Sequence, residues 1–228
     1  MSYVIESPET TELPVKGGGV FPIHQIYCVG RNYADHAVEM GGDPDKELPF
    51  FFMKPAYAVL GSGSEMEYPS LSSDVHHEVE LVVALGRGGR DVSVEDAIGL
   101  VYGYGVGIDM TRRDLQVEAK DKSRPWEAGK AFLHAAPCSD IVSIEETGEI
   151  NEAAISLSIN GEIRQDGNVN QLVWKVPEVI SRLSTLFSLR SGDLIFTGTP
   201  AGVGPINRGD EIRASLAGVG ELSISVSG

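Results

Sequence analysis

The stretch His76-His77-Glu78-Val79-Glu80-Leu81 leads into Val82 and Val83 and decides the fold that this sequence predicts. The apolar residues from Val79 to Val83 indicate a strand, in which Glu78 and Glu80 point to the same face. Neighbouring carboxylates repel each other, and a divalent cation such as Mg²⁺, Mn²⁺ or Ca²⁺ would remove that repulsion. The alternative is a solvated acidic edge strand, which the two glutamates taken alone favour.

A second predicted strand, at residues 103–110, supplies another carboxylate. Its alternate residues Gly103, Gly105, Gly107 and Asp109 share one face, so Asp109 is the functional group on a face that otherwise lacks side chains. Because glycine weakens a strand, something should need the space. Either a ligand lies beside Asp109 or another backbone packs against the glycines.

Length and composition limit the class of protein. The chain has 228 residues, of which 42% are hydrophobic and 22% charged, as expected of a globular domain. A formal charge of −15 disfavours nucleic acid as a partner, so an anionic substrate would need a local cluster of cations or a metal. Two cysteines in apolar settings, with no signal-peptide pattern and no long apolar run, predict a cytoplasmic protein that does not use a membrane.

No repeats or linkers divide the chain, so we expect an N-terminal arm at residues 1–20 and one catalytic domain at residues 21–228. Most of the domain reads as β structure, and Asn160-Gly161 predicts a hairpin. Expected strands cover residues 25–29, 50–55 (buried), 78–83, 103–110, 155–159, 194–196 and 222–226.

Helix-start signals interrupt these strands. A capping residue or an early proline predicts helices that begin near Asn32, Ser93, Thr111 and Pro177. In the first of them, His36 and Glu39 would share a face because they are three residues apart.

Several common sites are missing from the sequence. The glycine pairs lack dinucleotide-binding spacing, no phosphate loop or serine-nucleophile elbow occurs, and two distant cysteines do not make a zinc site. The remaining ionisable residues stand at the ends of apolar strands, which indicates that they converge on one active site. They are Arg31, His36, Glu39, Lys54, Glu78, Glu80, Asp109 and Lys130.

Five motifs occur in order: CVGRNYADH at 28–36, FMKP at 52–55, HHEVEL at 76–81, GIDMT at 107–111 and TGTPAGVG at 197–204. Together they resemble the fumarylacetoacetate hydrolase family, most of all its short acylpyruvate hydrolases. The resemblance implies a β-rich α+β fold, a mixed β-sandwich roll like the family's C-terminal domain, and a homodimer. It also implies that Glu78, Glu80 and Asp109 bind Mg²⁺ or Mn²⁺, with Ca²⁺ as an alternative.

The matching positions imply further roles. His36 and Glu39 would form a catalytic dyad, and Lys130 would be an active-site cation. Substrate or supporting contacts would come from Arg31, Lys54, Arg113, Gln116 and Thr199.

The implied reaction is hydrolysis of a carbon–carbon bond in a 2,4-dioxo acid, an acylpyruvate such as fumarylpyruvate, with release of pyruvate. His36, oriented by Glu39, would take a proton from water, and Lys130 would donate to the oxyanion. The metal would stabilise the charge of the pyruvate enolate. Oxaloacetate decarboxylation and isomerisation of an unsaturated dioxo acid are alternatives at the same site, and a dimer that binds a metabolite without turnover is another.

Overall fold

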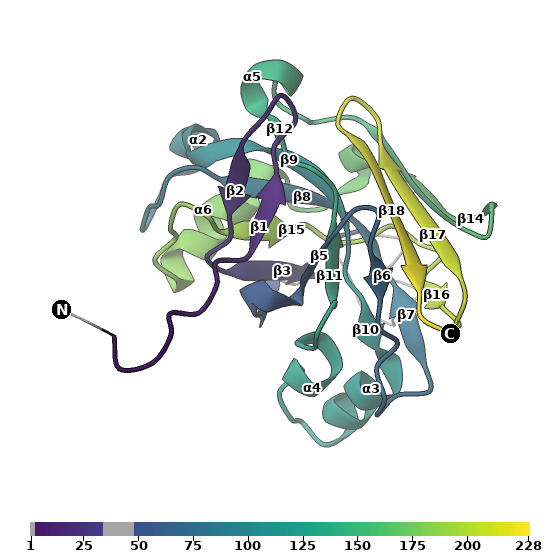
Figure 1. Ribbon diagram of the computed structural model, residues 1–228. Helices are drawn as coiled ribbons and strands as arrows, with labels where there is room; N and C mark the ends of the chain where they lie inside the picture. The colour runs from purple at the N-terminus through teal and green to yellow at the C-terminus, as the bar shows by residue number, and fades with distance from the viewer. Residues whose placement is uncertain (1–2, 34–47) are drawn as a thin grey trace.

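The computed structural model describes residues 3–33 and 48–228, and the antiparallel strands β8 (Val79–Leu85) and β9 (Val101–Ile108) lie at its centre (Figure 1). Every residue of β8 is buried. A strand covered on both faces has no need for alternating polar residues, which explains the continuous apolar run after Glu80.

These two strands belong to a large mixed sheet in the spatial order β4-β3-β15-β8-β9-β11-β5, with β12 also paired to β9. β15 runs parallel to β3 and antiparallel to β8, so the segment after its last residue lies beside the start of β8. The other strands are β3 (Ile26–Gly30), β4 (Phe50–Lys54), β5 (Val59–Gly61), β11 (Ala136–Cys138), β12 (Val142–Ser143) and β15 (Leu194–Phe196).

A second sheet has the order β14-β13-β17-β18-β6 and packs against β8 and β9. Buried and exposed residues alternate along β17, as expected of a sheet with one face on the core. The expected β-rich sandwich is therefore confirmed, as is the hairpin, in which Asn160 and Gly161 both have positive φ. The strands are β6 (Glu65–Met66), β13 (Ala154–Ile159), β14 (Glu162–Asn168), β17 (Glu211–Leu216) and β18 (Gly220–Val226).

Short strands complete the β structure. β1 (Glu12–Pro14) pairs with β2 (Val20–Pro22), and their central residues Leu13 and Phe21 are buried against the core. This pair spans the expected end of the N-terminal arm. A third small sheet joins β7 (Val75–His77), β10 (Thr111–Arg112) and β16 (Gly204–Pro205).

Helices cover the ends and one side of the sandwich. α6 (Val176–Leu186) turns its buried residues, among them Ile180 and Leu183, toward the core and packs beside α2 (Val94–Ala97). α3 (Arg113–Asp121) and α4 (Glu127–Lys130) lie together at one end of the sandwich (Figure 1). The remaining helical segments are η1 (Ala56–Ala58), η2 (Ile98–Leu100), α5 (Ile144–Thr147) and η3 (Val169–Gln171).

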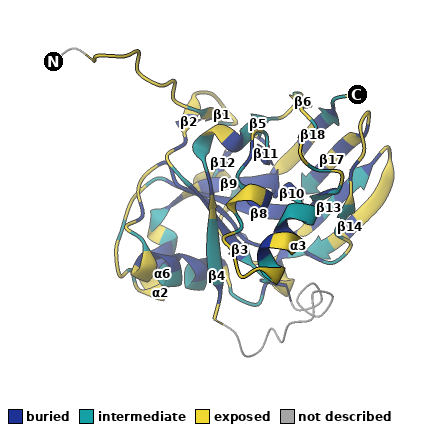
Figure 2. Cartoon of the chain, turned by 90° about the horizontal axis from the view of Figure 1, so that it is seen from below, coloured by how far each residue is buried: buried dark blue, intermediate teal, exposed yellow. Residues whose placement is uncertain are grey.

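Exposure follows these layers. Figure 2 shows buried residues along β8 and β9 and exposed ones on β14 and on the outer side of α3. Among residues 3–33 and 48–228, no helix is long and apolar enough to cross a membrane.

Two local predictions are wrong for identifiable reasons. Thr111 does not cap a helix, because it lies in β10 and its hydroxyl accepts a hydrogen bond from Lys130; α3 begins two residues later. The strand at 50–55 is not buried along its length, because β4 pairs only with β3 on the described path of the sheet. Its one fully buried residue is the charged Lys54. By contrast, Ser93 caps α2 as predicted, accepting from the Asp96 backbone N–H at 3.2 Å.

The glycine face of β9 serves packing rather than ligand binding. A Cβ at Gly107 would lie 2.6 Å from both a Phe196 ring atom and a Val82 methyl group, and one at Gly103 would meet the Val142 backbone. The packing alternative is therefore the one observed along these glycines.

Gly107→Ala should lower the free energy of unfolding by about 1–3 kcal/mol, because the added methyl group overpacks the core. Gly99→Ala is a matched control that should change it by less than about 0.5 kcal/mol, since no atom lies within 4 Å of its added Cβ. Urea unfolding of both variants checks this. Equal stability of the two would contradict the packing described for Gly107.

Candidate metal centre and substrate pocket

Three carboxylates meet at one end of the β8–β9 pair. The register places Glu80 opposite Gly107 and Val79 opposite Ile108, so that Asp109 donates its backbone N–H to the Glu78 carbonyl at 2.8 Å. One oxygen from each of Glu78, Glu80 and Asp109 lies within 4.8 Å of the others. Their exposed fractions are 6%, 2% and 1%, so the solvated acidic edge that the sequence left open is not what forms.

Three cations, from β4, α3 and α4, surround these acids. Lys130, at the end of α4, lies 2.7 Å from both Glu78 Oε2 and Asp109 Oδ2. Lys54, at the end of β4, lies 2.8 Å from Asp109 Oδ1, and Arg113, at the start of α3, pairs with Glu78 Oε1. Such pairing is what makes buried charges tolerable.

The negative charge of Glu80 is stabilised differently from the charges of Glu78 and Asp109. Within residues 3–33 and 48–228 no lysine or arginine forms an ion pair with it; its Oε2 accepts the backbone N–H of Gly198 at 2.7 Å. Gly198 follows β15 with a φ of 107°, a conformation that L side chains rarely adopt and that a glycine permits. Glycine at this position thus lets the backbone present its N–H to the carboxylate.

The ionisation of the two glutamates differs accordingly. Burial tends to raise the pKa of Glu78, but Lys130 and Arg113 outweigh it and hold that pKa well below its usual range. Burial and the charges of Asp109 and Glu78 raise the pKa of Glu80 well above its usual range. Glu80 is therefore the carboxylate whose charged form the protein's own groups stabilise least, and a divalent cation bound beside it would stabilise that form.

The surroundings of one carboxylate oxygen indicate whether the site suits a metal ion. Asp109 Oδ1 is buried and accepts no well-aligned hydrogen bond, because its contact with Lys54 at 2.8 Å lacks hydrogen-bond geometry. A buried carboxylate oxygen with a free lone pair, beside two further carboxylates, is a donor set for Mg²⁺, Mn²⁺ or Ca²⁺. The residues present fit a hard divalent cation.

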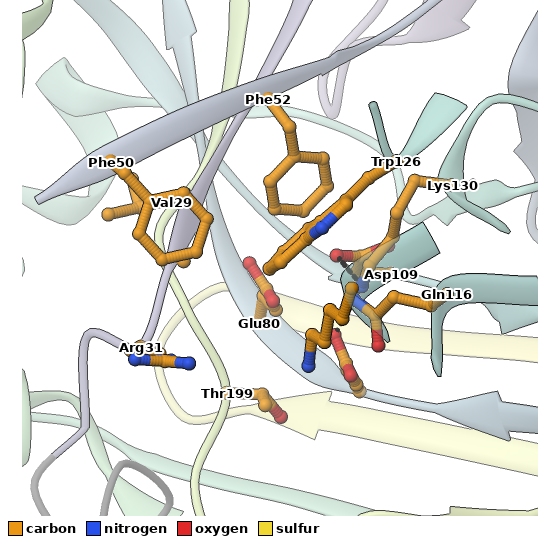
Figure 3. Close-up of a pocket in the computed structure, with 13 residues that line it drawn as sticks. Val29, Arg31, Phe50, Phe52, Glu80, Asp109, Gln116, Trp126, Lys130 and Thr199 are labelled. Carbon is orange, nitrogen blue, oxygen red and sulfur yellow. Dashed lines mark hydrogen bonds and ion pairs between the residues drawn. The ribbon is translucent and has the colours of Figure 1, made fainter. Parts of the chain in front are cut away.

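A narrow pocket of about 40 Å³ opens above the three carboxylates (Figure 3). Phe50, Phe52 and Trp126 form its apolar wall, and the Trp126 ring meets that of Phe50 edge-on with 5.2 Å between centroids. Lys130 passes along the face of the Phe52 ring on its way to the carboxylates, with its Nζ 5.0 Å from the ring centroid.

The other pocket walls present hydrogen-bond donors. Gln116 accepts from Arg113 at 2.6 Å through its amide oxygen, which leaves its NH₂ group to donate. Thr199 accepts from Gln165 at 2.7 Å, which leaves its hydroxyl proton to donate. Arg31 also lines the pocket, and its backbone φ of 57° is uncommon for a non-glycine residue. Together these groups suit an oxygen-rich, anionic ligand.

The sequence model described as "Fumarylacetoacetate (FAA) hydrolase C-terminal" matches residues 25–227. The chain belongs to the fumarylacetoacetate hydrolase family. It is 44% identical to a fumarylpyruvate hydrolase from Ralstonia sp over 189 residues, covering 82% of this chain and 98% of that protein. It is 43% identical to a mitochondrial oxaloacetate decarboxylase from Dictyostelium discoideum, covering 86% and 89%. A crystal structure of fumarylpyruvate hydrolase from Pseudomonas aeruginosa in complex with Mn²⁺ and pyruvate is 47% identical, with a TM-score of 0.97 and 99% of both chains covered.

The residues that the family resemblance singled out fall into three groups. Those that line the pocket are Arg31, Glu78, Glu80, Asp109, Gln116, Lys130 and Thr199. Lys54 and Arg113 stand behind the carboxylates and contact them without lining the pocket. His36 and Glu39 lie outside the described residues.

The sequence did not point to two residues of the site, Gln165 and Lys120. Gln165, on β14, accepts through its amide oxygen from the Val79 backbone N–H and from the His77 ring, and its amide nitrogen donates to Thr199, which joins the second sheet to the site. An interior glutamine on a strand from the other sheet carried no local signal. Lys120 did carry one, because it follows Gln116 by four residues on the same helix face.

Adding Mn²⁺ at about 100 times its dissociation constant should raise the free energy of unfolding of the wild-type protein by about 2.7 kcal/mol. Glu80→Gln should keep the fold, because a neutral side chain already suits this buried position, but should lose most of the stabilisation by Mn²⁺. Thermal unfolding with and without metal measures both effects. The control is Glu118→Gln, an exposed carboxylate on α3 whose loss should leave the metal effect unchanged; an undiminished Mn²⁺ effect in Glu80→Gln would contradict the assignment.

Proposed function

We propose that this protein is a divalent-metal-dependent hydrolase that cleaves a carbon–carbon bond in an acylpyruvate, preferably fumarylpyruvate, to give pyruvate and a carboxylic acid. The observation that carries the proposal is the buried carboxylate triad beneath a pocket whose walls offer hydrogen-bond donors and planar rings. A 2,4-dioxo acid has the oxygens and the flat conjugated chain that such a pocket would bind. The relative crystallised with Mn²⁺ and pyruvate supports the same choice.

Glu78, Glu80 and Asp109 are proposed to hold Mg²⁺ or Mn²⁺. When bound, the cation supplies Lewis-acid stabilisation for the 2-oxo group and for negative charge on the departing pyruvate. The protein's part is to orient the substrate: Gln116 and Thr199 can donate hydrogen bonds to its oxygens, and the rings of Phe52 and Trp126 can shield it from water.

The proposed hydrolytic step uses the His36–Glu39 dyad that the family resemblance implies. His36, oriented by Glu39, is proposed to take a proton from water, whose oxygen bonds to the acyl carbonyl carbon distal to the carboxylate. The carbon–carbon bond between that carbon and the pyruvyl methylene then breaks, and its electron pair leaves with pyruvate, which gains a proton at that carbon. Water is thus the sole co-reactant.

Lys130 is the proposed donor to the oxyanion of the attacked carbonyl. Its three N–H donors are engaged by Glu78, Asp109 and Thr111 in the structure, at 2.6–2.7 Å. Donation to an oxyanion would therefore require one of these bonds to lengthen. The two carboxylate bonds are the candidates, because their oxygens are the ones that a cation would attract.

Decarboxylation of oxaloacetate is the second candidate function. The oxaloacetate decarboxylase relative from Dictyostelium supports it, and a cation held by the same carboxylate triad would stabilise the enolate that loss of CO₂ generates. Isomerisation of an unsaturated dioxo acid would use the same stabilisation. Neither reaction requires an activated water, and a metabolite-binding dimer without turnover would require none of these steps.

The distinguishing assay couples pyruvate formation to lactate dehydrogenase for fumarylpyruvate, acetylpyruvate and oxaloacetate, each with Mg²⁺ or Mn²⁺. Wild-type protein should act best on fumarylpyruvate and lose turnover in excess EDTA, and Glu80→Gln should be inactive because it cannot hold the cation. Full activity of Glu80→Gln would exclude the triad as the metal site. Turnover of oxaloacetate alone would favour the decarboxylase, and binding without any turnover would favour a non-catalytic protein.

His36→Ala should reduce kcat for hydrolysis by about 10²- to 10⁴-fold while leaving metal and substrate affinity in place, because it removes the proposed base. Calorimetric titration with Mn²⁺ and steady-state kinetics separate the two properties. Undiminished hydrolysis would exclude His36 as the base.

We also propose that the protein acts as a cytoplasmic homodimer. Sedimentation analysis of the purified protein would determine the subunit number.

A further inference from the structure

Lys120 is a pocket residue to which the reaction above gives no task. It lies on α3 four residues after Gln116 and seven after Arg113, so the three side chains follow one face of the helix. It lines the same pocket as the carboxylates and is half-buried there. On helix geometry it stands about 6 Å farther along α3 than Gln116.

Lys120 differs from the other lysines of this region in the groups that its ammonium contacts. Lys54 and Lys130 contact the acids of the metal centre, and Lys122 pairs with Glu118 at 2.6 Å. In the part of the chain that the structure describes, Lys120 has no carboxylate within ion-pair distance. Its Nζ lies over the Trp126 ring, 5.0 Å from the ring centroid.

The surroundings of Lys120 are electropositive despite the overall charge of −15. Burial, and then the charges of Arg113 and Arg31, lower the pKa of Lys120, against a smaller opposing effect of Glu78. A half-buried cation among like charges is stabilised most directly by an anion that enters the pocket. Trp126 covers one side of the Lys120 ammonium group, so an anion would approach it from the pocket that both residues line.

We propose that Lys120 binds the second carboxylate of a dicarboxylate acylpyruvate and thereby selects dianionic over monoanionic acyl groups. This inference rests on the proposed hydrolase function and specifies its substrate class. One end of the substrate lies over the carboxylate triad, and the unsaturated acyl chain passes along the rings of Phe52 and Trp126. The far carboxylate then reaches Lys120, one helical turn beyond Gln116.

The test compares fumarylpyruvate, whose acyl group carries a carboxylate, with acetylpyruvate, whose acyl group does not. Lys120→Met should lower kcat/KM for fumarylpyruvate by about 10- to 100-fold, mainly through KM, because it removes one charge-assisted hydrogen bond made in both ground and transition states. For acetylpyruvate the change should stay within about twofold. Lys120→Arg should restore much of the preference because it keeps the charge.

Lys122→Met is the matched control on the same helix, and it should leave both substrates unaffected because Lys122 is exposed and paired with Glu118. Equal losses for the two substrates in Lys120→Met would show that Lys120 only supports the pocket, and no loss would show that it makes no contact. Either result overturns the inference and leaves the hydrolase function standing.

Failure of the function itself gives a different pattern, in which wild-type protein hydrolyses neither substrate. Binding then decides the role of Lys120. The dissociation constant of fumarate, measured by calorimetry, must rise in Lys120→Met and stay constant in Lys122→Met. If it does not, the inference is wrong as well.

Discussion

Mutual repulsion among Glu78, Glu80 and Asp109 is the constraint on which the rest of the structure depends. Three carboxylates with at most 6% exposure cannot be held together by apolar packing, because each would lose its hydration without replacement. The chain supplies cations from β4, α3 and α4 and a backbone N–H from the segment after β15. β4, α3 and α4 are therefore joined by the charge that they compensate, and removal of any one of the three cations would leave Glu78, Asp109 or both with one ion-pair partner fewer.

The cations and the backbone N–H do not stabilise the three negative charges equally, and the difference favours metal binding. Glu78 is stabilised as an anion by two cations, whereas the pKa of Glu80 is raised by burial and by its acidic neighbours. The remaining electrostatic stress can be relieved by a divalent cation, so the same arrangement that the fold has to stabilise also favours metal binding. Stability and affinity for the cation are thus linked through one cluster.

Two sets of cations serve different purposes around that cluster. Lys54, Lys130 and Arg113 contact the acids directly, and their donors are largely engaged. Lys120 stands farther out, against Trp126, where an incoming anion can reach it. A strongly acidic protein can therefore place a cation within reach of an anionic ligand in its pocket without attracting polyanions to its whole surface.

Local pattern in the sequence predicts the strand that carries Glu80, with Glu78 just before its first residue, as well as the Asn160-Gly161 hairpin, the Ser93 cap and, through five motifs, the family. These features depend on local periodicity and turn chemistry, which neighbouring residues encode. Only the tertiary structure decided that the glycines of β9 pack against Phe196 and the β12 backbone, that Thr111 receives Lys130 rather than capping a helix, and that Gln165 reaches the site from the other sheet. Those outcomes depend on which strands become neighbours, and the partners are 21 residues apart for Lys130 and Asp109 and 86 apart for Val79 and Gln165. Local pattern cannot specify contacts of that separation, because they exist only once the sheets have packed.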